Sequence, residues 1–274
     1  MNTSSWHDFM GELLGTFILV LFGCGSVAVT VLFGALTGLM QIAMVWGMAV
    51  TLAIYSTRHL SFAHFNPAVS LAMVVAGRMR GRFLPVYFAG QFSGAFIAAA
   101  LLYLLFGSSI AEFETANSIV RGAPESIKSA MIFGEYYPNP GSGSIAVVSG
   151  NLAFLAEAVG TFCLMLFILL LTDTANLGKP KDSSTPVFIG IALTLIISII
   201  APLTQAGLNP ARDFSPRILT VIAGWGDAAF PDKDYGFITV YMFGPVLGAV
   251  SASLLFTKLI QPLMTKKTAS DANS

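Results

Sequence analysis

Charged side chains are scarce in this chain. Only 10% of its 274 residues are Asp, Glu, Lys or Arg, whereas a soluble domain carries about 25%. The 14 basic and 14 acidic residues cancel, so no net charge is present that would attract nucleic acid. With 55% hydrophobic residues and a mean hydropathy of +0.77, the composition indicates an integral membrane protein with the lipid bilayer as its partner.

Cysteine and histidine are also rare. Cys24 and Cys163 cannot form a four-ligand metal site by themselves, and no His-rich metal motif lies in the apolar runs. Both cysteines fall inside such runs, where we expect buried, unreactive thiols. No Lys or Arg precedes Cys24, and Glu12 interrupts the apolar stretch, so the start of the chain does not resemble a signal peptide. We expect neither a metal nor a cofactor.

Six apolar runs are long enough to cross a membrane, which requires roughly 20 residues. They lie near residues 9–32, 37–57, 83–106, 147–171, 186–204 and 236–260. Two shorter segments, 67–77 and 210–222, predict re-entrant half-helices that end inside the membrane. Non-helical backbone at that depth survives only when it is buried in protein or lines a water-filled cavity. We therefore expect an all-α membrane protein that encloses a cavity.

Both predicted half-helices begin with Asn-Pro-Ala. Proline suits the first position of a helix, where its missing N–H would be unpaired anyway. Asparagine is a favoured N-cap, and after its oxygen has capped the helix its NH2 group can still donate to a passing molecule. Each helix N-terminus also carries a partial positive charge. The motif residues expected at the centre of a pore are Asn66, Pro67, Ala68, Asn209, Pro210 and Ala211.

The chain is a duplicated unit. Glu12-Leu-Leu-Gly-Thr-Phe17 recurs 145 residues later as Glu157-Ala-Val-Gly-Thr-Phe162, and the two Asn-Pro-Ala motifs are 143 residues apart. Interrupted hydrophobic segments at matching positions of two halves point to a binding site near the bilayer midplane. We expect an inverted internal repeat with these parts: first repeat 1–106, extracytoplasmic linker loop 107–146, second repeat 147–260, and cytoplasmic tail 261–274, disordered from Lys266.

Glu12 and Glu157 are the two acids inside spans, where a charged group costs about 2.5–3.5 kcal/mol on insertion scales. We expect each to accept hydrogen bonds from the loop that leads into a half-helix. Proton coupling is the alternative, but one relay would not need two equivalent copies. Arg212 should face the cavity and bond to loop carbonyls, and with the half-helix ends it should oppose protons and cations. Asp213 and Arg217 have the i, i+4 spacing of a pair.

Small residues and basic residues give the expected packing and orientation. Glycine pairs at i, i+4 allow close helix contacts in lipid: Gly11 and Gly15, Gly90 and Gly94, Gly244 and Gly248. The positive-inside rule places both termini in the cytoplasm, because nine of the 14 basic residues fall on that side. These nine are Arg58, Arg78, Arg80, Arg82, Lys179, Lys181, Lys258, Lys266 and Lys267. Trp6, Trp225 and Tyr241 are candidate interfacial anchors.

Several motifs together resemble one family. They are Val45-Trp46-Gly47, Ala63-His64-Phe65-Asn66-Pro67-Ala68-Val69, Ile119-Val120-Arg121-Gly122, Tyr137-Pro138-Asn139-Pro140, Asn209-Pro210-Ala211-Arg212-Asp213-Phe214 and Ala223-Gly224-Trp225-Gly226. The chain is similar to the major intrinsic proteins, and among them to the glycerol-facilitator branch. Asp213 and Pro245 are residues that also agree with the pattern of that branch. The resemblance implies an aquaporin-like homotetramer in the plasma (inner) membrane, with one pore in each subunit.

The resemblance also implies the residues that line the pore. Its selectivity filter corresponds to Trp46, Ile197, Ala206 and Arg212, and its loop carbonyls to Ala63, His64, Phe65, Ala206, Gly207 and Leu208, with Glu12, Glu157 and Asp213 as scaffold. Glycerol facilitators typically have Trp, Gly, Phe and Arg in the filter, so the chain departs at Ile197 and Ala206. The Trp, aliphatic, Ala, Arg set resembles plant nodulin-26-like channels, which pass glycerol and uncharged metalloid acids.

The expected function is a passive channel for glycerol and other small neutral solutes together with water. A water-selective channel and a urea or metalloid-acid channel of the same family are alternatives. A secondary transporter is a rival from another class, since inverted repeats with broken helices also build carriers. A membrane-embedded enzyme is remote, because the spans contain neither a Ser/His pair nor paired catalytic carboxylates.

Overall fold

The protein is a bundle of long helices, described here from a computed structural model of residues 3–141, 146–231 and 235–271. Six helices in the described chain are long and apolar enough to cross a membrane, as the sequence predicts. Five of them are α1 (Thr3–Phe33), α2 (Leu39–Thr57), α4 (Leu84–Ala116), α6 (Gly150–Thr172) and α7 (Thr185–Thr204). No strand occurs among the described residues.

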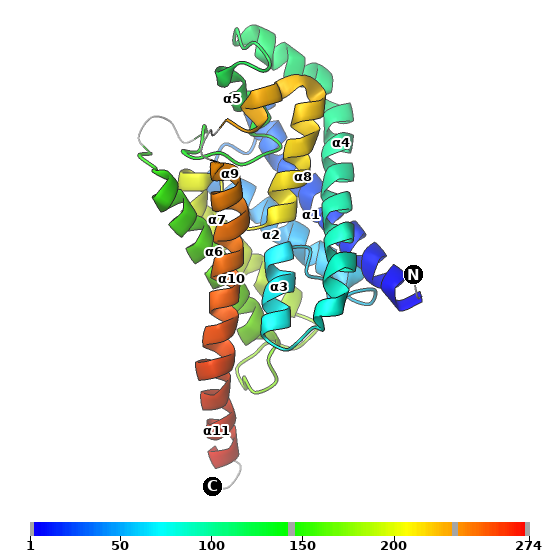
Figure 1. Cartoon of the computed structure of the whole chain (residues 1–274), viewed down its shortest axis with the longest axis vertical. Helices are drawn as coiled ribbons and strands as arrows, with labels where there is room; N and C mark the ends of the chain where they lie inside the picture. The colour runs from blue at the N-terminus through cyan, green and yellow to red at the C-terminus, as the bar shows by residue number, and fades with distance from the viewer. Residues whose placement is uncertain (1–2, 142–145, 232–234, 272–274) are drawn as a thin grey trace.

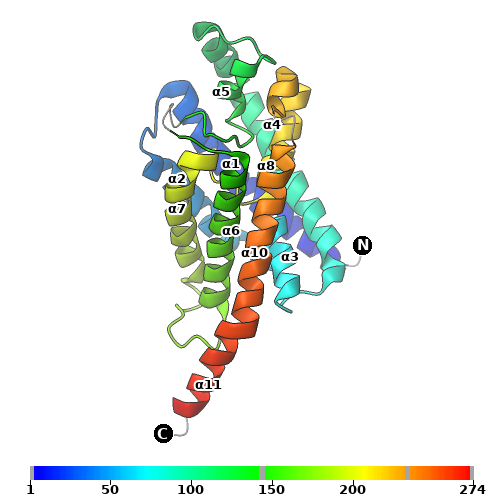
Figure 2. The same ribbon diagram turned by 60° about the vertical axis from the view of Figure 1, so that its left-hand side comes forward.

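The sixth spanning helix is assembled from consecutive segments near the C-terminus. It contains α9 (Gly236–Ile238), α10 (Gly244–Leu255) and α11 (Gln261–Asp271), joined by π-helical turns at Thr239–Phe243 and Phe256–Ile260. Figures 1 and 2 show α11 projecting away from the bundle.

Two short helices occupy the interior of the bundle. They are α3 (Pro67–Val75) and α8 (Pro210–Thr220). Figure 1 shows α3 in the lower half and α8 in the upper half, on opposite sides of the middle of the molecule. Their N-termini meet, because Asn66 and Asn209 each donate to a carbonyl of the other half. This arrangement is the inverted pair of half-helices that the duplicated sequence predicts.

Glycines set the distances between the long helices. A Cβ on Gly94 of α4 would lie 2.2 Å from the carbonyl oxygen of Leu13 in α1, and one on Gly248 of α10 would lie 2.0 Å from that of Ala158 in α6. The two crossings are equivalent in the two halves. At such distances only a residue without a side chain fits, so backbone meets backbone directly, as small residues permit in membrane helices.

Three boundaries differ from the expected ones. Helix α4 continues to Ala116 rather than ending at 106, because the polar segment that follows contains good helix formers and no proline. The predicted linker also contains short helical turns at Pro124–Ser126 and Ile127–Ala130 (α5). The tail was expected to be disordered from Lys266, but α11 runs to Asp271, with helix propagated from α10. Residues 142–145 of the linker and 272–274 of the tail lie outside the described residues.

Two of the expected interfacial anchors are instead internal. Trp225 is fully buried and its indole N–H donates to the Ser129 hydroxyl at 3.0 Å. Tyr241 is buried as well, and its hydroxyl donates to the Thr204 carbonyl at 3.2 Å. Trp6 is exposed, as an anchor requires. Of the two cysteines, Cys24 is buried and Cys163 is only partly so.

The glycine crossings generate a stability prediction. Gly94→Ala should lower the free energy of unfolding by about 1–3 kcal/mol, because the added methyl forces α1 and α4 apart. Gly107→Ala in the same helix is the matched control, since its nearest neighbour outside its own backbone is a Tyr103 ring carbon at 4.0 Å. The measurement is the apparent melting temperature in detergent by tryptophan fluorescence. Equal melting temperatures for the two variants would contradict the account of the crossing.

Candidate functional site: a pore between the half-helices

The two Asn-Pro-Ala motifs form matching N-caps. The Asn66 side-chain oxygen accepts from the backbone N–H of Ala68 at 2.9 Å. The Asn209 oxygen accepts from the N–H groups of Ala211 and Arg212 at 3.0 and 3.2 Å. Each following proline occupies the first helical position. The local sequence therefore determines where both half-helices begin.

The asparagine amides also tie the halves together. Asn66 Nδ2 donates to the Leu208 carbonyl, and Asn209 Nδ2 donates to the Phe65 carbonyl, both at 2.8 Å. Since an amide NH2 carries two hydrogens, each asparagine keeps one N–H for a molecule in the adjacent cavity. The sequence indicated a free NH2 group, whereas tertiary contact leaves only half of it free.

The loops before the half-helices are held in an unusual backbone conformation. Ala63 and Phe65 in the first loop, and Gln205, Ala206 and Leu208 in the second, have φ between 53° and 63°. This left-handed conformation costs a residue with a side chain roughly 1–2 kcal/mol. This conformation turns successive backbone carbonyls so that their oxygens remain available as hydrogen-bond acceptors. In a helix, the N–H groups of the helix itself would bond to them. Such strain persists only when surrounding contacts hold it in place.

Glu12 supplies those contacts to the first loop. It is fully buried, and its carboxylate accepts from the backbone N–H groups of His64 at 3.0 Å and Phe65 at 2.7 Å. It also accepts from the Ser61 hydroxyl and the Gln91 amide, each at 2.7 Å. Four donors therefore surround a carboxylate whose burial would otherwise be costly.

Glu157 does the same for the second loop. Its oxygens accept from the N–H groups of Gly207 at 2.9 Å and Leu208 at 2.6 Å, and from the Thr204 hydroxyl at 2.6 Å. Its position, 145 residues after Glu12, brings it to the equivalent place in the second repeat. Both acids are thus occupied by structural hydrogen bonds.

One cavity of about 390 Å³ passes along these loops. It runs from Arg58 and Asp182 at one end, past Asn66 and Asn209, to Trp46 and Arg212. Six residues are expected to line it through their carbonyls, and five of them lie in its lining: Ala63, His64, Ala206, Gly207 and Leu208. Phe65 is not in the lining, and its ring packs against Gly15 instead.

The four expected filter residues lie in the wall of this cavity. Trp46 and Ile197 present an apolar surface, and Ala206 and Arg212 complete the lining. The Trp46 indole has room only because residue 23 is glycine, where a Cβ would lie 2.3 Å from the ring. The Arg212 guanidinium lies over that indole, 4.6 Å from the ring centroid. The cavity therefore has an aromatic wall and a donor-rich wall in the same narrow region.

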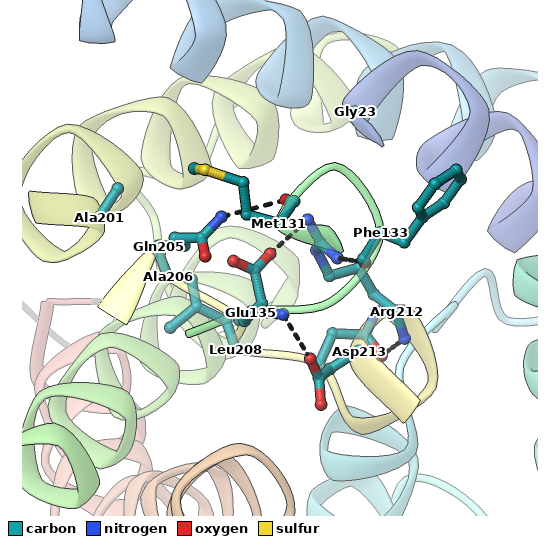
Figure 3. Close-up of polar contacts among 12 residues, drawn as sticks. Gly23, Met131, Phe133, Glu135, Ala201, Gln205, Ala206, Leu208, Arg212 and Asp213 are labelled. Atoms are coloured by element: carbon teal, nitrogen blue, oxygen red, sulfur yellow. Dashed lines mark hydrogen bonds and ion pairs between the residues drawn. The ribbon is translucent and has the colours of Figure 1, made fainter. Parts of the chain in front are cut away.

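Arg212 is anchored by a segment that sequence reasoning had assigned to a linker. Its Nη1 donates to the Phe133 carbonyl at 2.9 Å, and its Nη2 forms an ion pair with Glu135 (Figure 3). The expected loop-carbonyl bond exists, but Glu135 was not anticipated. A buried arginine needs a partner of opposite charge. In the sequence, the sign of such a partner is an acid in the long polar loop.

A second ion pair lies directly after Arg212 on α8. Asp213 and Arg217 are both buried and pair at 2.6 Å. Asp213 also accepts from the Glu135 backbone N–H at 2.7 Å. Gln205 adds another link, since its side chain accepts from the Tyr136 N–H at 2.9 Å and donates to the Met131 carbonyl at 3.3 Å. The segment 131–136 is therefore bonded directly to Arg212 and to the residues beside it.

Several known proteins are similar to this chain in sequence. The family model of the major intrinsic proteins matches residues 1–256. The glycerol uptake facilitator of Pseudomonas aeruginosa is 43% identical over 90% of this chain and 86% of its own, and that of Haemophilus influenzae is 40% identical over 95% and 96%. The propanediol uptake facilitator of Citrobacter freundii is 38% identical over 95% of this chain and 94% of its own.

A solved structure shares the architecture. The aquaglyceroporin from Plasmodium falciparum superposes with a TM-score of 0.80 at 28% identity, covering 95% of this chain and 98% of that one. The two capped half-helices, the paired loops and the cavity between them thus occur in a fold common to these proteins. The chain belongs to the major intrinsic protein family, whose members are channels rather than enzymes.

Proposed function

We propose that the protein is a passive channel that lets glycerol, together with water, cross the plasma (inner) membrane. The observation that carries the proposal is the two-sided wall of the cavity. Trp46 and Ile197 form an apolar side, and the Arg212 guanidinium with the loop carbonyls of Ala206 and Gly207 forms the polar side. Glycerol has hydroxyls along one edge and CH groups along the other, so it matches both. The names of the relatives from Pseudomonas aeruginosa and Haemophilus influenzae support this solute.

Passive passage agrees with the chemistry of the cavity. A proton-coupled carrier needs an ionisable group that is free to titrate in the pathway. Glu12 and Glu157 are occupied by loop donors, and Asp213 and Arg217 are paired with each other. Glu135 is paired with Arg212 and is not among the residues that line the cavity. Saturable or gradient-driven glycerol uptake into proteoliposomes would favour a carrier over the proposed channel.

Ile197 should set the width of the filter. Ile197→Gly removes four carbons from the apolar wall and should raise the ratio of glycerol to water permeability about tenfold, a change typical of altering an apolar pocket by a methylene or more. Ile197→His should lower the ratio, because the imidazole adds a polar group that favours water. Both ratios are measured by stopped-flow light scattering on proteoliposomes.

Ile199→Gly is the matched control for this series. Ile199 lies on the same helix but is 73% exposed on the outer surface of the bundle. The Ile199→Gly variant should leave the ratio of glycerol to water permeability unchanged. It places the same helix-destabilising glycine in α7. Unchanged ratios in both Ile197 variants would remove Ile197 from the filter, and urea or boric acid in the same assay tests the alternative solutes.

Proton exclusion should depend on the positive ends of the half-helices. Asn209→Asp places a carboxylate at the N-terminus of α8 and should raise the proton leak roughly tenfold, because a charge in a partly desolvated site shifts a barrier by about 1–2 kcal/mol or more. The leak is measured with a pH-sensitive dye inside proteoliposomes. Asn117→Asp, at an exposed helix end, adds the same charge far from the pore. A folded, water-conducting Asn209→Asp variant with no extra leak would refute the electrostatic account.

Assembly and orientation form part of the same proposal. We expect four chains to form a homotetramer with a pore in each, and both termini to lie in the cytoplasm. The excess of Arg and Lys in the loops beside α3 and between α6 and α7 supports the orientation. Native mass spectrometry should give a species of four chains, and a C-terminal fluorescent reporter should be active only if that end is cytoplasmic. A monomer or an inactive reporter would contradict these expectations.

A further inference from the structure

The ion pair between Glu135 and Arg212 is buried beside the filter. The two side chains are only 1% and 3% exposed. The backbone of Glu135 is fixed on both sides, because its N–H donates to Asp213 and its carbonyl accepts from Arg217. The contacts with α8 therefore fix the backbone from which the carboxylate reaches Arg212. Figure 3 shows the carboxylate directed at the Arg212 guanidinium.

Arg212 has three attachments of different kinds. The Phe133 carbonyl takes one N–H, the Trp46 ring takes the face of the guanidinium, and Glu135 supplies the only carboxylate in an ion pair with it among the described residues. The carbonyl and the ring are neutral, so Glu135 is the attachment that carries charge. Both hydrogen-bonded attachments are charge-assisted, since the guanidinium is ionised, but only Glu135 adds an opposite charge. Glu135 is thus the one restraint whose charge can be lost.

The carboxylate itself is incompletely satisfied. Oε1 faces Arg212, whereas the buried Oε2 has no hydrogen-bond partner in the part of the chain that the structure describes. Such an atom favours the protonated, neutral form of the group. The hold on Arg212 should therefore respond to whether Glu135 is ionised.

We propose that Glu135 is a further specificity-determining residue, which acts through Arg212 by holding its guanidinium against the loop wall and out of the lumen. The inference rests on the proposed glycerol channel and deepens it. An ionised Glu135 keeps the passage open beside Trp46 and Ile197. A neutral residue 135 releases the guanidinium, which then extends its N–H groups into the lumen. Glycerol is larger and carries three hydroxyls, so it is slowed more than water.

The pH dependence has a defined sign. Burial raises the pKa of Glu135 to about 8, against the opposing effect of the Arg212 charge. Above that pH the carboxylate is ionised and holds Arg212, and as the pH falls through about 8 the restraint weakens. The other titratable or charged groups whose charges act on Glu135, or on which its charge acts, are Asp213 and Arg217 of α8, Glu157 of α6, Cys24 of α1, Tyr136 of its own loop and Tyr241.

The decisive variant is Glu135→Gln, which keeps the size and an acceptor oxygen but removes the charge. In proteoliposomes, the wild-type ratio of glycerol to water permeability should be about threefold higher at about pH 10 than at about pH 6, the rate factor of one weakened charge-assisted bond. Glu135→Gln should show the low-pH ratio at both values. The matched control is Glu125→Gln, an exposed acid of the same loop region, which should keep the wild-type profile.

The outcomes separate this inference from the proposed function. If wild-type vesicles pass no glycerol at either pH, the glycerol channel is refuted, and the pH profile of water permeability then tests Glu135 alone. If glycerol passes but Glu135→Gln keeps the wild-type ratio and profile, Glu135 does not determine specificity. Should that variant fail to insert, a flat wild-type profile between the two pH values would overturn the inference by itself.

Discussion

The hydrogen bonds from two buried glutamates to the backbone of the pore loops are the interaction on which the rest depends. Each loop must keep residues with side chains in the left-handed conformation, which is unfavourable unless it is externally held. Glu12 and Glu157 take two backbone N–H groups each from these loops. With its N–H groups satisfied on one side, the loop has its carbonyl groups available on the other. The hydrogen bonds between acid and loop thus offset both the cost of burying the acid and the strain of the loop.

That arrangement requires the long helices to approach very closely. Gly94 and Gly248 bring α4 onto α1 and α10 onto α6, and Gly15 and Gly160 leave room for the side chains of Phe65 and Leu208 from the loops. The crossings repeat in both halves, so the half-helices meet end to end. The asparagine amides then complete the junction by donating across it.

The proposed filter contains residues that are positioned in two different ways. Trp46 and Ile197 are placed by ordinary helix packing, whereas Arg212 is placed by a loop from between the repeats. Phe133 and Glu135 contact Arg212, and Gln205 bonds to segment 131–136, so that loop supports the cavity wall from behind Arg212. The four filter positions that the family resemblance implies therefore leave out Glu135. This residue adjoins Arg212 and carries the opposite charge.

The sequence alone determined the spans, the two half-helices, their caps and the repeat, because these follow from local composition and from patterns that recur along the chain. It also placed Glu12 and Glu157, since an acid in an apolar helix needs donors and the loops supply them. It did not reveal Glu135, the full burial of Trp225 and Tyr241, or the use of the Phe65 carbonyl by Asn209. Each of these depends on residues between 37 and 144 positions apart. Only tertiary packing brings such residues together, and no local propensity encodes which loop closes over which helix end.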